Sequence, residues 1–201
     1  GHQVHLHRRQ KGQRVKNEVP IHERRFTLTH AYFPARDQIP RMKKLGMGVD
    51  TQSFLYLRDA DAMAKVYGRS WAERLIGLGD WVRGGIPVAT NSDHMIGLDP
   101  DHSMNSFNPF LMLYLAVSRK DEFGNVYGPH QKLTREEALR CVTTNAAWLS
   151  FDEEKKGTLE PGRLADLCVI DRDYLTCPEE QIRKIKVLIT MVDGKVVYER
   201  E

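Results

Sequence analysis

The sequence predicts an α/β fold with a parallel sheet, followed by a small antiparallel β region. Short apolar runs alternate with helix-like segments up to about residue 150, and this alternation is typical of right-handed βαβ units. From Gly157 onward short strands and turns follow one another without long helices. We therefore expect two parts, an α/β part over residues 1–156 and a β part over residues 157–201.

The first part contains the alternating elements. Strands are expected from apolar runs at 3–7, 25–29, 47–52 and 86–90. Helices are expected at 37–45, as two short helices within 59–83, and at 109–117, 134–142 and 144–149. Asn108 and Pro109 are typical of the cap and first position of a helix. Thr134 and Glu137 have the spacing of a capping box.

The second part is expected to be mostly β. A strand and turn are predicted at 157–162, a strand at 165–170, a helical turn at 178–185 and a hairpin over 186–198. Asp193-Gly194 is the dipeptide that a type I′ turn prefers. Cys168 lies within an apolar strand run, so we expect it to be a small core residue.

Composition excludes several classes. The 201 residues carry 30 Lys and Arg against 27 Asp and Glu, and the basic run near the N-terminus lacks interleaved aromatic residues, which argues against nucleic-acid binding. Three cysteines form no C-x-x-C pair, so neither a disulfide scaffold nor a zinc finger is expected. No apolar run is long enough for a membrane span,. We expect a cytoplasmic protein.

Histidines or an acid follow three of the expected parallel strands. His7 and His30 end the first two. Asp93 follows the run Pro87–Thr90 after two polar residues, Asn91 and Ser92. The carboxyl ends of parallel strands meet at one edge of the sheet, where α/β enzymes keep their chemistry. Imidazole and carboxylate are the ligands of catalytic zinc, which turns a bound water into a nucleophile. We predict a divalent metal, zinc, held by His7, His30 and Asp93, with Asp93 as general base.

Further residues are candidates for the surroundings of this site. His5 competes with His7 because the two lie on the same face of one strand. His94 neighbours Asp93 and could orient a substrate or the carboxylate. Tyr32, Gln52 and Asn105 could polarise a carbonyl group or shape the pocket.

Several stretches together resemble the second half of amidohydrolase family 3. They are Leu28-Thr-His30-Ala, Asp37-Gln-Ile-Pro40-Arg-Met-Lys-Lys-Leu-Gly46, Gln52, Ala89-Thr-Asn-Ser-Asp93 and four segments between 133 and 198. The resemblance covers nearly the whole chain. It implies the second half of a (β/α)8 TIM-type barrel, with strands equivalent to 5–8, plus C-terminal strands of a small β-sandwich. It also implies that His7 and His30 are the ligands of strands 5 and 6, that Asp93 is the acid of strand 8, and that His5 points into the barrel.

The function that follows is metal-dependent hydrolysis of a carbon–nitrogen bond other than a peptide bond, in a small-molecule amide or N-acyl substrate. The family's first four barrel strands, including an H-x-H pair, have no counterpart in these 201 residues. We therefore expect this chain either to belong to a longer polypeptide or to self-associate, and to bind metal weakly by itself. The alternative is a truncated, non-catalytic remnant that acts as a structural or interaction module.

Overall fold

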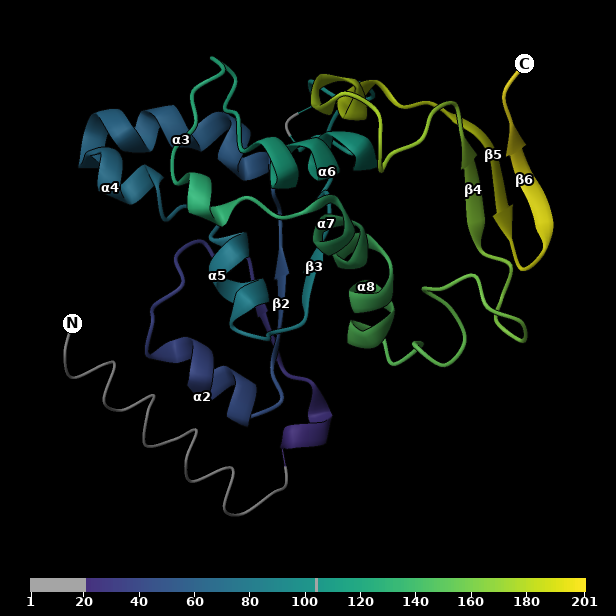
Figure 1. Ribbon diagram of the computed structural model, residues 1–201, viewed down its shortest axis with the longest axis horizontal. Helices are drawn as coiled ribbons and strands as arrows, with labels where there is room; N and C mark the ends of the chain where they lie inside the picture. Colours follow the sequence, from purple (N-terminus) through teal and green to yellow (C-terminus); the bar gives the residue numbers. More distant parts are fainter. Residues whose placement is uncertain (1–20, 104) are drawn as a thin grey trace.

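The computed structural model describes residues 21–103 and 105–201, and the strand and the two histidines predicted at 3–7 lie outside this range. A parallel sheet forms the centre of the described chain (Figure 1). Its strands lie in the order β1-β2-β3 and are β1 (Thr27–Thr29), β2 (Gly48–Thr51) and β3 (Val88–Thr90). The predicted alternation of strand and helix is confirmed.

Helices connect and cover these strands. Between β1 and β2 lies α2 (Gln38–Lys44), and between β2 and β3 lie α3 (Phe54–Tyr67), α4 (Arg69–Ala72) and α5 (Leu78–Arg83). After β3 come α6 (Pro109–Ser118), α7 (Arg135–Val142) and α8 (Thr144–Leu149). Two short 3-10 helices complete this part, η1 (His22–Arg24) and η2 (Pro129–Gln131).

The predicted helix starts after β3 are confirmed in detail. The side chain of Asn108 accepts a hydrogen bond from the backbone of Phe110, with Pro109 at the first helical position. The reciprocal bonds of a capping box join Thr134 and Glu137. Every residue from Phe110 to Ser118 is buried, as its apolar character on all sides predicts. Helix α6 is therefore the centre of the core rather than a surface helix.

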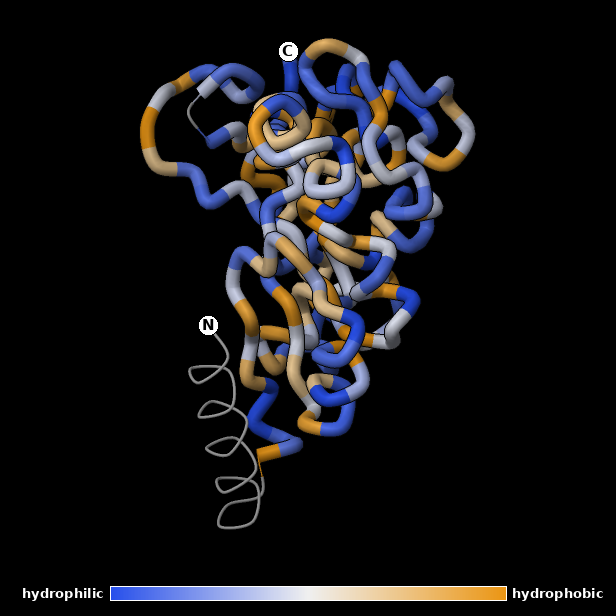
Figure 2. The backbone as a smooth tube through the Cα atoms, turned by 90° about the vertical axis from the view of Figure 1, so that its left-hand side faces the viewer, coloured by the Kyte–Doolittle hydropathy of each residue, from blue (hydrophilic) through white to orange (hydrophobic). Residues whose placement is uncertain are grey.

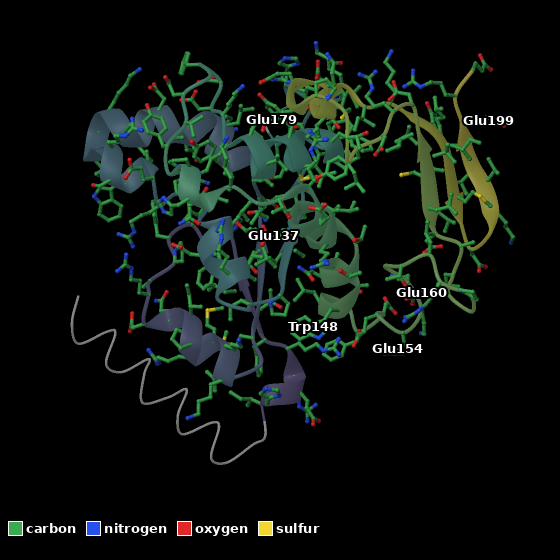
Figure 3. All side chains as sticks on the ribbon, in the orientation of Figure 1. Glu137, Trp148, Glu154, Glu160, Glu179 and Glu199 are labelled. Atoms are coloured by element: carbon green, nitrogen blue, oxygen red, sulfur yellow. The ribbon has the colours of Figure 1, made fainter. Side chains whose placement is uncertain are left out.

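A second, antiparallel sheet lies to one side of the first (Figure 1). It contains β4 (Leu167–Ile170), β5 (Val187–Val192) and β6 (Lys195–Glu199), with the 3-10 helix η3 (Glu179–Lys184) before β5. Asp193 and Gly194 both have positive φ, 50° and 74°, as a type I′ turn requires. In Figure 3 Glu160 precedes this sheet and Glu199 ends β6.

Three expectations were wrong. In place of the two short helices expected within 59–83 there are three, and the first begins at Phe54, because buried apolar side chains and not a polar cap anchor its first turn. The strand expected at 157–162 is a series of turns and bends. Cys168 is exposed, because it lies on the wall of an open groove between the helices and the C-terminal sheet.

The main core lies between the parallel sheet and the helices. Its largest fully buried side chains include Trp81, Tyr56, Phe54, Leu75 and Ile76. Segments beyond residue 157 contribute to it as well, since Tyr174, Ile182 and Ile185 belong to the same cluster. Figure 2 shows hydrophobic residues along the inner segments and hydrophilic residues on many outer loops. The boundary at 156/157 stays a prediction.

Arg119, directly after α6, is buried with 3% of its surface exposed. Its guanidinium donates to four backbone carbonyls, those of Glu73, Leu75, Ile76 and Tyr127. It also lies 4.2 Å from the centre of the Tyr56 ring. Burial lowers the pKa of this guanidinium to about 10. The positive charge is thus stabilised by the dipoles of the backbone carbonyls and by the face of an aromatic ring.

A second arginine joins the start of β1 to the end of α8. Arg25 forms a bidentate ion pair with Glu153 and stacks on two rings, 4.6 Å from the centre of Trp148 and 4.3 Å from that of Phe151. Figure 3 labels Trp148 at the end of α8. This pairing lowers the pKa of the Glu153 carboxyl to about 2 through the hydrogen bonds from Arg25.

No helix in the described part of the chain has the length and apolar character needed to cross a membrane.

Candidate functional site

Polar side chains gather where the three parallel strands end. His30 follows β1, Gln52 follows β2, and Asn91 and Asp93 follow β3. Gln52 and Asn91 each lie one residue past the last paired positions, Thr51 and Thr90. The parallel pairing therefore places residues that are distant in sequence at the same edge of the sheet.

A chain of hydrogen bonds connects these residues. The Nδ1 atom of His30 lies 2.8 Å from Oε1 of Gln52, and Nε2 of Gln52 donates to Oδ1 of Asn91 at 3.2 Å. The same Asn91 oxygen accepts from the backbone nitrogen of Asp93 at 2.8 Å. The Asn91 amide nitrogen donates to Asp50. His30 and Asp93 are thus linked through two amide side chains.

The loop after β3 fixes Asp93 from the other side. Asn105, which is buried, donates from its side chain to the backbone carbonyl of Asp93. The Nδ1 atom of His94 lies 2.8 Å from the backbone oxygen of Asn105, and its ring packs edge-on against Phe107 with the centres 4.6 Å apart. His94 therefore anchors the base of the loop, and its ring is engaged in the loop's own packing.

Beyond this base, the loop carries apolar residues into solvent. Met95, Ile96 and Leu98 are exposed. The ring of Tyr32 lies near that of His30, with the ring centres 6.3 Å apart.

The electrostatics reflect this clustering. Burial raises the pKa of the Asp50 carboxyl, against the opposing effects of the Asn91 hydrogen bond and of His30, while the charge of Asp93 adds to the rise. Burial also raises the pKa of the Tyr32 hydroxyl, and the negative charges of Asp59 and Asp93 raise it further. Tyr32 is therefore a neutral hydrogen-bond donor at physiological pH.

His30 and Asp93 both have left-handed backbone conformations, with φ of 64° and 45°. Residues other than glycine adopt this region at a cost of roughly 1–2 kcal/mol. Such strain persists where surrounding contacts hold it, and it is concentrated at functional sites. Here the contacts are the bond from the Thr51 hydroxyl to the His30 carbonyl and the two bonds to the Asp93 backbone.

Six of the predicted site residues thus lie together, namely His30, Tyr32, Gln52, Asp93, His94 and Asn105. His5 and His7 lie outside the described residues. Asp50 and Asn91 were missed by the sequence reasoning. Asn91 directly follows β3, and Asp50 occupies the alternate position two residues before Gln52. Polar residues at those places are the signal that could have found them.

The donor chemistry of His30 and Asp93 fits a zinc-type ion. Gln52 holds Nδ1 of His30, which leaves Nε2 as the ligand atom in the arrangement typical of metal-binding histidines,. Imidazole nitrogen and carboxylate oxygen are both zinc ligands. Within 21–103 and 105–201, however, no group of three or more His, Cys, Asp or Glu side chains could hold a metal. The third predicted ligand, His7, is not among those residues.

A groove of about 1230 Å³ lies elsewhere, between α6, α7 and α8 on one side and β4 and β5 on the other. Its lining is mainly apolar and includes Leu139, Val142 and Leu175. None of the residues at the parallel strand ends lines it. A polar reaction centre is therefore better placed at the strand ends than in this apolar groove.

Comparisons with known proteins identify the family to which the chain belongs. The model of the amidohydrolase family matches residues 7–198. N-substituted formamide deformylase from Arthrobacter pascens is 30% identical over 86% of this chain and 31% of its own length. The chain spans about a third of the length of the curated relatives it matches.

Solved structures share the fold. An uncharacterized metal-dependent hydrolase from Pyrococcus horikoshii is 24% identical with a TM-score of 0.62, over 77% of this chain and 30% of that one. A mutant of an atrazine chlorohydrolase from Arthrobacter aurescens, complexed with zinc and atraton, is 22% identical with a TM-score of 0.55, over 86% and 36%. The mixed α/β arrangement is thus one found in metal-dependent hydrolases. With a family model that matches nearly its entire length, this chain belongs to the amidohydrolase family.

Proposed function

We propose that this chain is the metal-site part of a hydrolase that cleaves a carbon–nitrogen bond other than a peptide bond, in a small amide or N-acyl substrate. In this proposal β1–β3 correspond to strands 6–8 of a (β/α)8 barrel, and β4–β6 belong to a small β-sandwich. The observation that carries the proposal is the hydrogen-bonded connection of His30 to Asp93 at the carboxyl ends of β1 and β3.

In the proposed site His30, Asp93 and His7 would hold a zinc ion. A bound zinc ion supplies Lewis acidity and lowers the pKa of water. Asp93 accepts a proton from the attacking water and delivers it to the leaving nitrogen, which is general acid–base work. The Tyr32 hydroxyl, kept protonated by burial and by its acidic neighbours, is available to donate to the substrate carbonyl oxygen.

The apolar tip of the loop after β3 lies next to Asp93. Met95 and Ile96 come two and three residues after Asp93 and are 68% and 65% exposed. They suit the apolar part of an N-substituted amide better than a charged substrate, because apolar surface gains by leaving water.

The test is formate release from an N-substituted formamide by the zinc-loaded protein. We expect Asp93→Asn to lower kcat/KM by about 10²-fold or more, the typical contribution of a general base. Asp99→Asn is the matched control. It lies on the same loop, and an asparagine oxygen can still accept from the backbone of Asp101 and His102. Equal activity of the two variants would contradict the role of Asp93.

A second candidate is a non-catalytic module, and one observation favours it. The described residues bring together fewer than three groups suited to a metal. Zinc titration of the chain separates the two candidates. Stoichiometric zinc that is lost in His30→Ala supports the hydrolase, whereas an absence of zinc binding together with an absence of hydrolysis supports the module.

Self-association also stays a proposal. Val169, Val192, Val196 and Val197 on the C-terminal sheet are each at least 43% exposed, and such apolar strands favour pairing with another chain. Sedimentation of the chain over a range of concentrations tests it, and a concentration-independent monomer would exclude it.

A further inference from the structure

We propose that Asn91 is a positioning residue that fixes which ring nitrogen of His30 carries the proton and, at the same time, holds the backbone of Asp93. The consequence for metal binding rests on the proposed function, but the effect on the His30 tautomer does not. The side chain of Asn91 is connected to both predicted ligands. It reaches His30 through Gln52 and accepts directly from the backbone nitrogen of Asp93.

The direction of the hydrogen bonds begins at Asp50. An ionised carboxylate only accepts hydrogen bonds, so the group of Asn91 that faces Asp50 must be its NH2 group. The Asn91 oxygen then faces the opposite way. It is an acceptor, and its partner on Gln52 must therefore be a donor, the Nε2 group 3.2 Å away.

The same reasoning continues to the histidine. Since Nε2 of Gln52 points to Asn91, the Gln52 oxygen points to Nδ1 of His30, 2.8 Å away. An oxygen acceptor requires a proton on that nitrogen. Neutral His30 is thereby held with hydrogen on Nδ1 and a lone pair on Nε2. Gln52 has only 1% of its surface exposed, so water does not offer its amide an alternative set of partners.

The second role of Asn91 concerns the chain direction after β3. Its oxygen also accepts from the backbone nitrogen of Asp93, in the local pattern that asparagine forms two residues ahead of itself. Asp93 has a φ of 45° there, which is unfavourable for a residue other than glycine. Asn91 therefore supports both the strained backbone of one predicted ligand and the protonation of the other.

A side chain at position 91 that only filled space would not determine which nitrogen of His30 carries the proton. An apolar residue of the same size could occupy the position of Asn91, but it would leave the Gln52 amide free to turn. The proton of His30 would then no longer be confined to one nitrogen. The tautomer of His30 is thus a property that the proposed role controls and that simple packing does not.

The experiment is nitrogen-15 NMR of the His30 ring in the full chain without metal, at about pH 8.5, where imidazole is neutral. In the wild type we expect the Nδ1–H form to predominate by about tenfold, the preference that one good hydrogen bond provides. In Asn91→Leu this preference should fall to about twofold or less.

Asn145→Leu is the matched control. Asn145 is also a partly buried asparagine beside β3, where it donates to the carbonyl of Val88, but it makes no contact with the strand-end network. Its loss should leave the His30 tautomer unchanged. An Nε2–H form in the wild type, or the same tautomer ratio in Asn91→Leu as in the wild type, would overturn the proposal. Circular dichroism of each variant verifies that the chain is folded.

Zinc titration gives the second measurement. Residues that orient a ligand typically change metal affinity by about 10–100-fold when replaced, and Asn91→Leu should do so while Asn145→Leu does not. A chain that shows the expected tautomers but takes up no zinc supports the role of Asn91 and counts against the proposed metal site. A chain that takes up zinc with the same affinity in both variants counts against the role of Asn91.

Discussion

Arg119→Leu is expected to destabilise the fold more than the replacement of any exposed arginine. The change removes the guanidinium that joins the end of α6 to the backbone of residues 73–76 and of Tyr127. Leucine fills part of the volume but donates nothing. The four carbonyl oxygens would then remain buried with fewer hydrogen-bond donors. Leaving a buried acceptor without a donor costs the free energy of removing it from water.

The magnitude follows from two opposing contributions. Four hydrogen bonds from a charged donor, at about 1.5 kcal/mol each, favour the arginine by about 6 kcal/mol. Burial lowers the pKa of Arg119 from 12.5 to about 10, which corresponds to roughly 3 kcal/mol of lost solvation. The net expectation is a loss of about 3 kcal/mol, or about 6–12 °C in Tm for a domain of this size.

Urea and thermal unfolding followed by circular dichroism measure this loss. Arg69→Leu is the matched control, because Arg69 also donates to a carbonyl of the same loop, that of Val126, and lies over a tyrosine ring. Its side chain is 64% exposed, so its replacement should cost less than about 1 kcal/mol. Equal losses in the two variants would show that burial and carbonyl contacts do not set the contribution of Arg119.

Three more replacements test separate features. Gly46→Ala should cost at least about 2 kcal/mol, since the glycine has a φ of +64° and an added Cβ would lie 2.1 Å from the His22 carbonyl oxygen,. Thr134→Ala should cost about 1 kcal/mol by removing the cap of α7,. The Glu153 carboxyl has its pKa lowered to about 2 by Arg25, so its contribution is complete above its ordinary pKa of 4.5 and is lost as the pH falls toward 2. Glu153→Gln should flatten the dependence of Tm on pH in that window.

Controls for these three come from the same chain. Gly124 also has a positive φ but has open space around its Cα, so Gly124→Ala should cost only the backbone strain, about 1 kcal/mol. Thr158 bonds only to an exposed glutamate, and Thr158→Ala should change stability by less than about 0.5 kcal/mol. Glu154→Gln, beside Glu153 but exposed, should leave the acid limb of the Tm curve as it is in the wild type. A control variant that shows the same change in stability, or in the pH dependence of Tm, as its test variant would refute the reason given for that prediction.

Elements with strong local signals could be predicted from the sequence. The starts of α6 and α7 follow from Asn108-Pro109 and Thr134, because a cap satisfies backbone donors within a few residues. The hairpin β5–β6 follows from Asp193-Gly194 for a similar local reason. The order β1-β2-β3 follows from the alternation of strands and helices, and with it the clustering of His30, Gln52 and Asp93.

What could not be predicted depends on contacts between distant segments. Helix α3 begins earlier than expected because Phe54, Leu55 and Tyr56 are buried in the core, while the Ser53 hydroxyl donates to the carbonyl of Met112 and does not cap the helix. Cys168 has an apolar sequence context, but its exposure depends on what covers the C-terminal sheet. The roles of Asn91 and Asp50 were missed although Asn91 lies within the stretch Ala89–Asp93, because their contact arises from the register that brings β2 and β3 side by side.

The hydrogen-bonded connection between His30 and Asp93 also makes the site sensitive to hydrolysis of side-chain amides. Two of its members, Gln52 and Asn91, are primary amides, and these side chains are among the least durable in proteins. Hydrolysis of either amide exchanges a donor for an acceptor with almost no change in shape or mass. Stored or heated samples would therefore lose this connection while their circular dichroism, size and solubility stay the same. Mass spectrometry of the peptide that contains Asn91 would distinguish such aged molecules from intact ones.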